Sequence, residues 1–343
     1  MMGVQVNSGP QLKREISYSR NIFLPITNIC RNRCTYCGFR RDPNDGAWFM
    51  RPEEVIALAG RAKAVGCSEA LLTLGERPES HGEAREKLKS LGYRSTVGYL
   101  ENLCKQILEL GLLPHTNAGL LNEQELRRLR RYNASMGLML ECAVELPAHR
   151  DSPGKRPDLR LRVIERAGKL RIPFTTGLLI GIGESREDRV RSLQEIKKLH
   201  ERYGHIQEVI IQPFEPKPGT PMANCARPNL DELLSTVVVA RELMPEMNIQ
   251  VPPNLLSHDG GVEAVLRAGV NDFGGISPLT PDFINPEHPW PSVGELRAAV
   301  ERAGFVPRER LPIYPRYVRD EKFMSKEVRE RVLELVDGEG YRR

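Results

Sequence analysis

The chain has 343 residues, a formal net charge of +5, seven cysteines, and 40% hydrophobic against 28% charged residues. This composition is typical of a globular protein that buries a full core, and it disfavours intrinsic disorder and collagen-like structure. The odd number of cysteines argues against a disulfide scaffold. Because neither an apolar leader nor a run of about 20 apolar residues is present, we expect a cytoplasmic protein that binds neither membrane nor, with its balanced charge, nucleic acid.

Short apolar runs alternate with helical patterns along almost the whole chain. The predicted strands are Asn21–Thr27, Glu69–Leu74, Leu112–Asn117, Ser135–Glu141, Ile172–Ile180, Ile206–Phe214, Asn248–Val251 and Gly269–Phe273. The predicted helices are Pro52–Val65, Val97–Leu110, Leu159–Leu170, Asn229–Leu243 and Gly261–Ala268, and two more begin at the capping signals Asn122 with Glu125 and Ser185 with Asp188. Eight alternations without an obvious linker favour a parallel (βα)8 barrel of the TIM type, although an open doubly wound sheet shows the same alternation.

Three segments follow from this pattern. Residues 1–20 are predicted to be an N-terminal extension, residues 21–313 the barrel, and residues 314–343 a charged tail with a helix against the outside. The basic run Arg127–Arg131 follows Glu123 and Glu125 on a predicted helix. We therefore interpret it as a solvated helix face and not as a nucleic-acid site.

Cys30, Cys34 and Cys37 stand together directly after the first predicted strand. In a barrel this loop lies at the C-terminal face, where active sites are built. A structural zinc site is usually closed by four ligands, whereas three thiolates on a four-iron cluster leave one iron open. The spacing therefore favours a [4Fe–4S] cluster over zinc or a chance grouping. The other cysteines are expected to be dispensable for it: Cys67, Cys104, Cys142 and Cys225.

The Cys-x3-Cys-x2-Cys loop, with Tyr36 before its last cysteine, resembles the signature of the radical S-adenosylmethionine (SAM) enzymes. This resemblance implies a radical SAM barrel in which the open iron binds the amino and carboxylate groups of SAM. An external electron donor would reduce the cluster. Cleavage of SAM would then release a 5′-deoxyadenosyl radical that takes hydrogen from the substrate.

The same resemblance suggests residues for the methionyl end of SAM. Gly75 and Glu76 match the last two positions of the family's Gly-Gly-Glu motif, whose first glycine is replaced here by Leu74. Glu141, at the predicted end of the fourth strand, is similar to a ribose or methionyl contact, with a solvated carboxylate as the alternative. Arg160 corresponds to an arginine for the SAM carboxylate, with an ordinary surface arginine as the alternative.

The segment from Gly177 to Glu184 resembles the fifth-strand motif of the biotin synthase branch of this superfamily. The resemblance implies that Gly177, Gly181 and Gly183 let the adenine of SAM approach the backbone. The spacing does not match a dinucleotide-binding fingerprint.

Longer motifs together resemble the 7,8-didemethyl-8-hydroxy-5-deazariboflavin (FO) synthase family, in its first, ring-closing subunit. They are Asn21–Thr27, Cys30–Cys34, Ala47–Met50, Thr73–Glu79, Ile172–Gly177, Gly204–Glu208 and Asn271–Ser277. The resemblance implies a radical SAM lyase of coenzyme F-420 biosynthesis. A second FO synthase subunit would supply a hydroxybenzyl–ribityliminouracil adduct, which this chain would convert to FO with loss of ammonia.

Polar residues on the late strand ends are the candidates for contacts with this small-molecule substrate. They are Gln212, Asn254, Asp272, Gly274 and Ser277. His149, in the long loop Leu146–Pro157, and Asp272 are possible acid–base groups, and His115 ends the third strand. Alternatives remain open: another biotin synthase-like or menaquinone-route radical SAM enzyme, or a non-catalytic iron–sulfur carrier.

Overall fold

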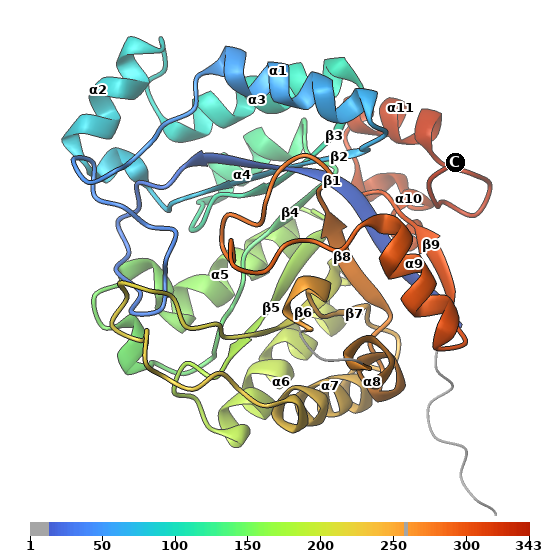
Figure 1. Ribbon diagram of the computed structural model, residues 1–343. Helices are drawn as coiled ribbons and strands as arrows, with labels where there is room; N and C mark the ends of the chain where they lie inside the picture. Colours follow the sequence, from blue (N-terminus) through green and yellow to red (C-terminus); the bar gives the residue numbers. More distant parts are fainter. Residues whose placement is uncertain (1–13, 257–259) are drawn as a thin grey trace, which may run out of the picture.

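The computed structural model describes residues 14–256 and 260–343 and contains a closed barrel of eight parallel strands (Figure 1). The strands are β1 (Glu15–Thr27), β2 (Glu69–Leu74), β3 (Leu113–Asn117), β4 (Ser135–Gly137), β5 (Phe174–Ile180), β6 (Ile206–Pro213), β7 (Ile249–Gln250) and β8 (Asp272–Ile276). β1 pairs with β2 on one side and with β8 on the other, which closes the sheet. The predicted TIM-type barrel is therefore confirmed.

Helices surround the barrel and connect successive strands. They are α1 (Pro52–Ala64), α2 (Gly82–Ser90), α3 (Thr96–Leu110), α4 (Glu123–Arg130), α5 (Pro157–Lys169), α6 (Arg186–Tyr203), α7 (Leu230–Leu243), α8 (Gly261–Ala268) and α9 (Val293–Arg302). Both predicted capping signals form complete capping boxes, at Asn122 with Glu125 and at Ser185 with Asp188. None of the described helices is long and apolar enough to cross a lipid bilayer.

Several predicted boundaries were wrong. β1 begins at Glu15, so the barrel takes in residues that we had assigned to the extension 1–20, of which residues 1–13 lie outside the described residues. β4 stops at Gly137, short of Glu141, because the chain turns into a loop there. β8 runs from Asp272 to Ile276 and not from Gly269 to Phe273, which places Asp272 at the start of the strand.

A ninth strand, β9 (Val306–Glu309), was not predicted. It pairs in parallel with the first residues of β1, from Glu15 to Tyr18, and so extends the sheet at the N-terminal end of the barrel. The polar sequence Val-Pro-Arg-Glu does not show the apolar pattern of a buried strand, which explains why the sequence analysis missed it.

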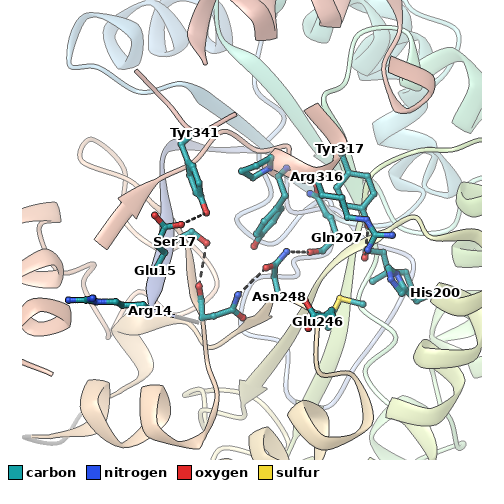
Figure 2. Close-up of a pocket in the computed structure, with 15 residues that line it drawn as sticks. Arg14, Glu15, Ser17, His200, Gln207, Glu246, Asn248, Arg316, Tyr317 and Tyr341 are labelled. Carbon is teal, nitrogen blue, oxygen red and sulfur yellow. Dashed lines mark hydrogen bonds between the residues drawn. The ribbon is translucent and has the colours of Figure 1, made fainter. Parts of the chain in front are cut away.

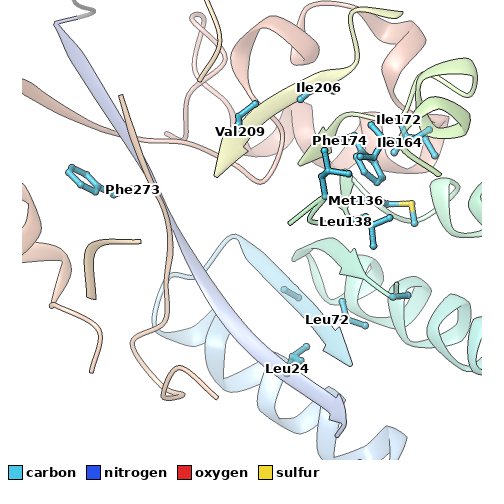
Figure 3. Packing of buried hydrophobic residues seen from close by; sticks show 14 of the residues in the cluster. Leu24, Leu72, Met136, Leu138, Ile164, Ile172, Phe174, Ile206, Val209 and Phe273 are labelled. Atoms are coloured by element: carbon cyan, nitrogen blue, oxygen red, sulfur yellow. The ribbon is translucent and has the colours of Figure 1, made fainter. Parts of the chain in front are cut away.

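The core lies between the barrel wall and the helices (Figure 3). Buried side chains from several strands, such as Leu24, Leu72 and Phe174, pack against the apolar faces of the helices. These strands are apolar on their outer face because the helices cover it, as is usual for parallel sheets.

The tail packs against the N-terminal end of the barrel. Its elements α10 (Pro315–Val318) and α11 (Lys326–Leu335) share a second apolar cluster with Leu113 of β3. The segment before α10 enters the barrel itself, because the carbonyl of Pro312 accepts hydrogen bonds from Ser135 and Gln207 on β4 and β6. Residues of this segment thereby close the floor of the barrel interior.

Candidate active site

Two connected cavities fill the barrel interior. The upper chamber, of about 360 Å³, is lined by the cysteine loop and by Glu76, Glu141, Lys155 and Arg160. The lower chamber, of about 170 Å³, lies deeper between the strands and is lined by polar residues that include Glu69, His115, Glu208, Gln250 and Arg310. They meet at a shared ring of residues: Phe23, Leu71, Asn117, Thr175, Ile210, Gln212, Ile284 and Asn285.

All three cysteines of the predicted cluster loop line the upper chamber, as free thiols of intermediate exposure. The loop is held against the end of β2, where the backbone N–H groups of Asn32 and Glu76 point at Sγ of Cys30, at 3.4 and 3.1 Å. Gly75 is required for this contact, because a Cβ there would lie 2.1 Å from the carbonyl oxygen of Ile29. Gly75 therefore lies beside the cluster loop, and its predicted contact with SAM stays a prediction.

The chemistry of this loop fits an iron–sulfur cluster. Burial raises the pKa of Cys30 to about 11 and also raises the pKa of Cys37, so a bound cation is needed to hold them as thiolates. In the described residues, no three Cys, His, Asp or Glu side chains gather closely enough for one metal ion. A single zinc requires all its sulfurs at about 2.3 Å from one centre, whereas the ligands of a cluster bind separate irons, and three thiols on one loop suit the latter.

Glu76 is fixed by several partners at the rim. Its carboxylate accepts hydrogen bonds from Arg31, at 2.9 Å, and from the backbone N–H of Leu120, at 3.0 Å. Arg160 lies 3.9 Å away, only 3% exposed, and donates to the carbonyl of Gly154 at 3.0 Å. The structure therefore removes the alternative of a surface arginine and places Arg160 at the wall of the upper chamber.

Glu141 also lies inside the upper chamber and not in solvent. Its backbone is in the left-handed region with φ of 65°, and its carboxylate is paired with Lys155. Burial alone would raise the pKa of Glu141, but the charges of Lys155 and Arg160 lower it below its ordinary value. Lys155 was not predicted from the sequence. The only feature that could have indicated it is its basic side chain in the long loop assigned to the barrel mouth.

Tyr36 lines the upper chamber with its ring, and its hydroxyl is hydrogen-bonded to Nε2 of His149 at 2.9 Å. Burial lowers the pKa of His149 to about 4, so this imidazole is neutral near pH 7. His149 stands behind Tyr36 and is not among the described residues that line either chamber. Its geometry is that of a group that orients Tyr36.

The glycines of the fifth-strand motif have structural explanations. Gly177 lies within β5, where a Cβ would be 2.1 Å from the carbonyl oxygen of Ile210 on β6. Gly181 has a φ of 93°, and its N–H donates to Glu184 at 2.7 Å. Gly177, Gly181 and Gly183 are not among the described residues that line the upper chamber. On this side of the barrel the chamber is lined by Leu179 and Phe214.

Two of the five predicted substrate residues line the lower chamber, namely Gln212 and Gly274. Asp272 is fully buried in an ion pair with Arg310 and does not face the cavity. Its misplacement follows from the register of β8, which begins at this residue. Asn254 donates to Asp282 at 2.9 Å, and Ser277 closes a turn with Thr280, so both hold the loop after β8 in place.

Most of the residues that form the floor of the lower chamber were not predicted from the sequence. Arg310 is bound to Asp272 on β8 and to Glu208 on β6, at 2.7 and 3.1 Å. Burial raises the pKa of Glu208 to about 7, although Arg310 opposes this shift. His115, hydrogen-bonded to Ser135 at 2.7 Å, has its pKa lowered to about 4 by burial. These contacts join segments that are distant in the sequence, so no local motif indicates them.

A third cavity, of about 520 Å³, lies at the opposite end of the barrel, between its N-terminal end and the tail (Figure 2). Its polar residues are bonded to one another: Tyr341 donates to Glu15 at 3.2 Å, and Asn271 donates to Asn248 at 3.0 Å. It is remote from the cysteine loop, so we interpret it as a seam between tail and barrel despite its size.

Comparison with known proteins agrees with this arrangement. Residues 24–196 match the family model described as "Radical SAM superfamily". The chain is 52% identical to 7,8-didemethyl-8-hydroxy-5-deazariboflavin synthase of Methanosarcina barkeri, over 96% of this chain and 99% of that protein. It is 50% identical to the enzyme of the same name from Methanopyrus kandleri, over 96% and 100%.

Solved structures show the same fold at low sequence identity. Methylornithine synthase is 20% identical with a TM-score of 0.66, covering 86% of this chain and 84% of that one. The FeFe-hydrogenase maturase HydG from Carboxydothermus hydrogenoformans is also 20% identical, with a TM-score of 0.68 over 93% and 76%. With the cysteine loop, the barrel and the near full-length identity together, the chain belongs to the radical SAM superfamily and, within it, to the 7,8-didemethyl-8-hydroxy-5-deazariboflavin synthase family.

Proposed function

We propose that this chain is the ring-closing subunit of FO synthase, acting on the hydroxybenzyl–ribityliminouracil adduct and releasing FO and ammonia. The observation that carries this proposal is the 50–52% identity to FO synthases along nearly the whole chain. A second subunit would supply the adduct, and an external donor would supply the electron.

Cys30, Cys34 and Cys37 would hold a [4Fe–4S] cluster in the upper chamber, with SAM beside it. When bound, the cluster and SAM together supply a carbon radical that abstracts hydrogen from the substrate. Lys155 and Arg160, which lie beside the carboxylates of Glu141 and Glu76, would also attract the SAM carboxylate in this cavity of low polarity, where charge pairing is strong.

The chain's own residues then position the reactants and exclude water. Phe39 lines the upper chamber, and its ring contacts Trp48, which in turn contacts Phe283, with centroids 5.6 and 6.3 Å apart. Phe23 continues this aromatic wall down to the junction of the chambers. Such a wall shields a reactive carbon radical from solvent and from side reactions.

The direct test is anaerobic incubation with SAM, a reductant and the adduct, followed by FO fluorescence. We expect FO to form together with 5′-deoxyadenosine, and neither product with the Cys34→Ala variant. SAM cleavage without FO would instead indicate another radical SAM activity. An iron–sulfur protein that never cleaves SAM would contradict an enzymatic role and favour a carrier.

A further inference from the structure

The lower chamber exposes neutral hydrogen-bonding groups that the protein leaves without partners. The side-chain amides of Gln212 and Gln250 line it, and neither makes a hydrogen bond to another described residue. Oδ1 of Asn21 and Nε1 of Trp290 are buried in its wall, and both lack a partner among the described residues. Because buried polar groups in folded proteins are nearly always bonded, these four groups indicate a ligand that offers both donors and acceptors.

The lower chamber is lined by more carboxylates than cations. Arg310 is bound by Asp272 and Glu208. Glu69 and Asp282 accept hydrogen bonds from neutral hydroxyl and amide groups. An anionic ligand would be repelled by these carboxylates, so the chamber suits an uncharged polar ligand that can donate hydrogen bonds to them.

Apolar side chains separate this polar space from the cysteines. Phe23, Leu71, Ile210 and Ile284 belong to the ring that both chambers share. A ligand that spans the ring would therefore have an uncharged, strongly polar end below it and an apolar or aromatic part at its level. The polar end of the ligand lies in the lower chamber, because that chamber offers the unpaired hydrogen-bonding groups.

We propose that the lower chamber binds the ribityl–uracil end of the substrate through Asn21, Gln212, Gln250 and Trp290, with the hydroxybenzyl end facing the cysteine loop. This inference rests on the proposed function for the identity of the ligand. The substrate contacts proposed here replace those predicted from the sequence at Asp272 and Ser277. A polyol with several hydroxyls and a uracil with amide groups match the free donors and acceptors.

The test uses the anaerobically reconstituted holoenzyme with SAM and two unreactive probes, 6-(D-ribitylamino)uracil and 6-(methylamino)uracil. We expect the ribityl probe to bind the parent protein at least about tenfold more tightly, since a site built for hydroxyls discriminates against a ligand that lacks them. Gln250→Leu and Trp290→Phe should each reduce this ratio several-fold by weakening only the ribityl probe. Gln124→Leu, an exposed glutamine on α4, is the control and should bind both probes as the parent does.

Iron content and SAM affinity report whether each variant is intact. Trp290→Phe keeps an aromatic ring, so it remains informative even if Gln250→Leu folds poorly. Equal affinity of both probes for the parent, or an unchanged ratio in intact Gln250→Leu and Trp290→Phe proteins, would overturn the assignment. FO formation is measured separately: a protein that binds the ribityl probe as expected but makes no FO would support the chamber assignment while contradicting the proposed function.

Discussion

The upper and lower chambers are built from the same barrel but differ in charge and in origin. Beside the cysteine loop, the cations Arg31, Lys155 and Arg160 face the carboxylates of Glu76 and Glu141. The lower chamber is lined by neutral amides and by more carboxylates than cations. The cations above suit thiolates and the carboxylate of a cofactor, whereas the polar groups below suit an uncharged ligand that donates hydrogen bonds.

The two chambers also differ in how they are encoded. Most of the upper wall comes from loops that directly follow β1, β2 and β4. The lower floor depends on Arg310, which directly follows β9 and joins strands far away in the sequence. The comparison teaches that cofactor residues can lie in local motifs while the substrate end of the same cavity is made by long-range contacts.

The largest effect is expected at the cysteines of the upper chamber. Replacing Cys34 with Ala should remove cluster absorbance and abolish SAM cleavage, because a three-ligand cluster has no spare thiolate. Iron analysis and 5′-deoxyadenosine measurements check this. Cys225→Ala alters an exposed thiol and should leave both unchanged, so a loss of iron in that variant would contradict the assignment.

Replacing Arg310, the buried arginine of the lower chamber, should strongly lower the free energy of unfolding. Arg310→Met leaves the carboxylates of Asp272 and Glu208 buried without their cation, which we expect to cost about 3–5 kcal/mol. Arg308, two residues earlier on β9, bonds to surface carboxylates, and Arg308→Met should cost about 1 kcal/mol or less. Denaturant unfolding of both variants measures the difference, and equal losses would show that the network has no special role.

A third, smaller effect is expected where β2 meets the cysteine loop. Gly75→Ala would press a methyl group into the backbone of Ile29 and should lower the unfolding free energy by roughly 1–3 kcal/mol, with reduced iron content. Gly60→Ala, in the interior of α1 with open space around it, should instead stabilise by about 0.5–1 kcal/mol. Thermal unfolding and iron analysis distinguish them, and normal iron loading of the Gly75 variant would contradict the close packing.

A further effect is a pH dependence that belongs to the lower chamber. Burial raises the pKa of Glu208 from 4.5 to about 7, so the folded protein holds this proton more tightly than the unfolded chain. The resulting stabilisation is complete below about pH 4.5 and is lost as the pH rises through about 7. Glu208→Gln cannot titrate, so the stability difference between parent and variant should shift over this window. A difference that stays constant from pH 4.5 to 7 would mean that the carboxyl remains ionised.

Much of the fold and the upper chamber could be predicted from the sequence. Periodic apolar runs marked the eight strands, and the cysteines, Gly75 and Arg160 stand in short local motifs that the structure brings to one cavity. Asp272 was misplaced because a shift of three residues in β8 moves a side chain from the rim to the floor. Arg310, Gln250 and Trp290 could not be predicted, since their roles arise only when β7, the late loops and the segment after β9 come together in the barrel.

The central claim is that the two chambers divide the work between cofactor and substrate. The most direct measurement is the ratio of 5′-deoxyadenosine to FO formed under anaerobic turnover, in the parent and in the Gln250→Leu and Trp290→Phe variants. We expect both variants to bind and cleave SAM but to make less FO, so that the ratio rises several-fold. A parallel fall of both products at a constant ratio would contradict the division between the chambers.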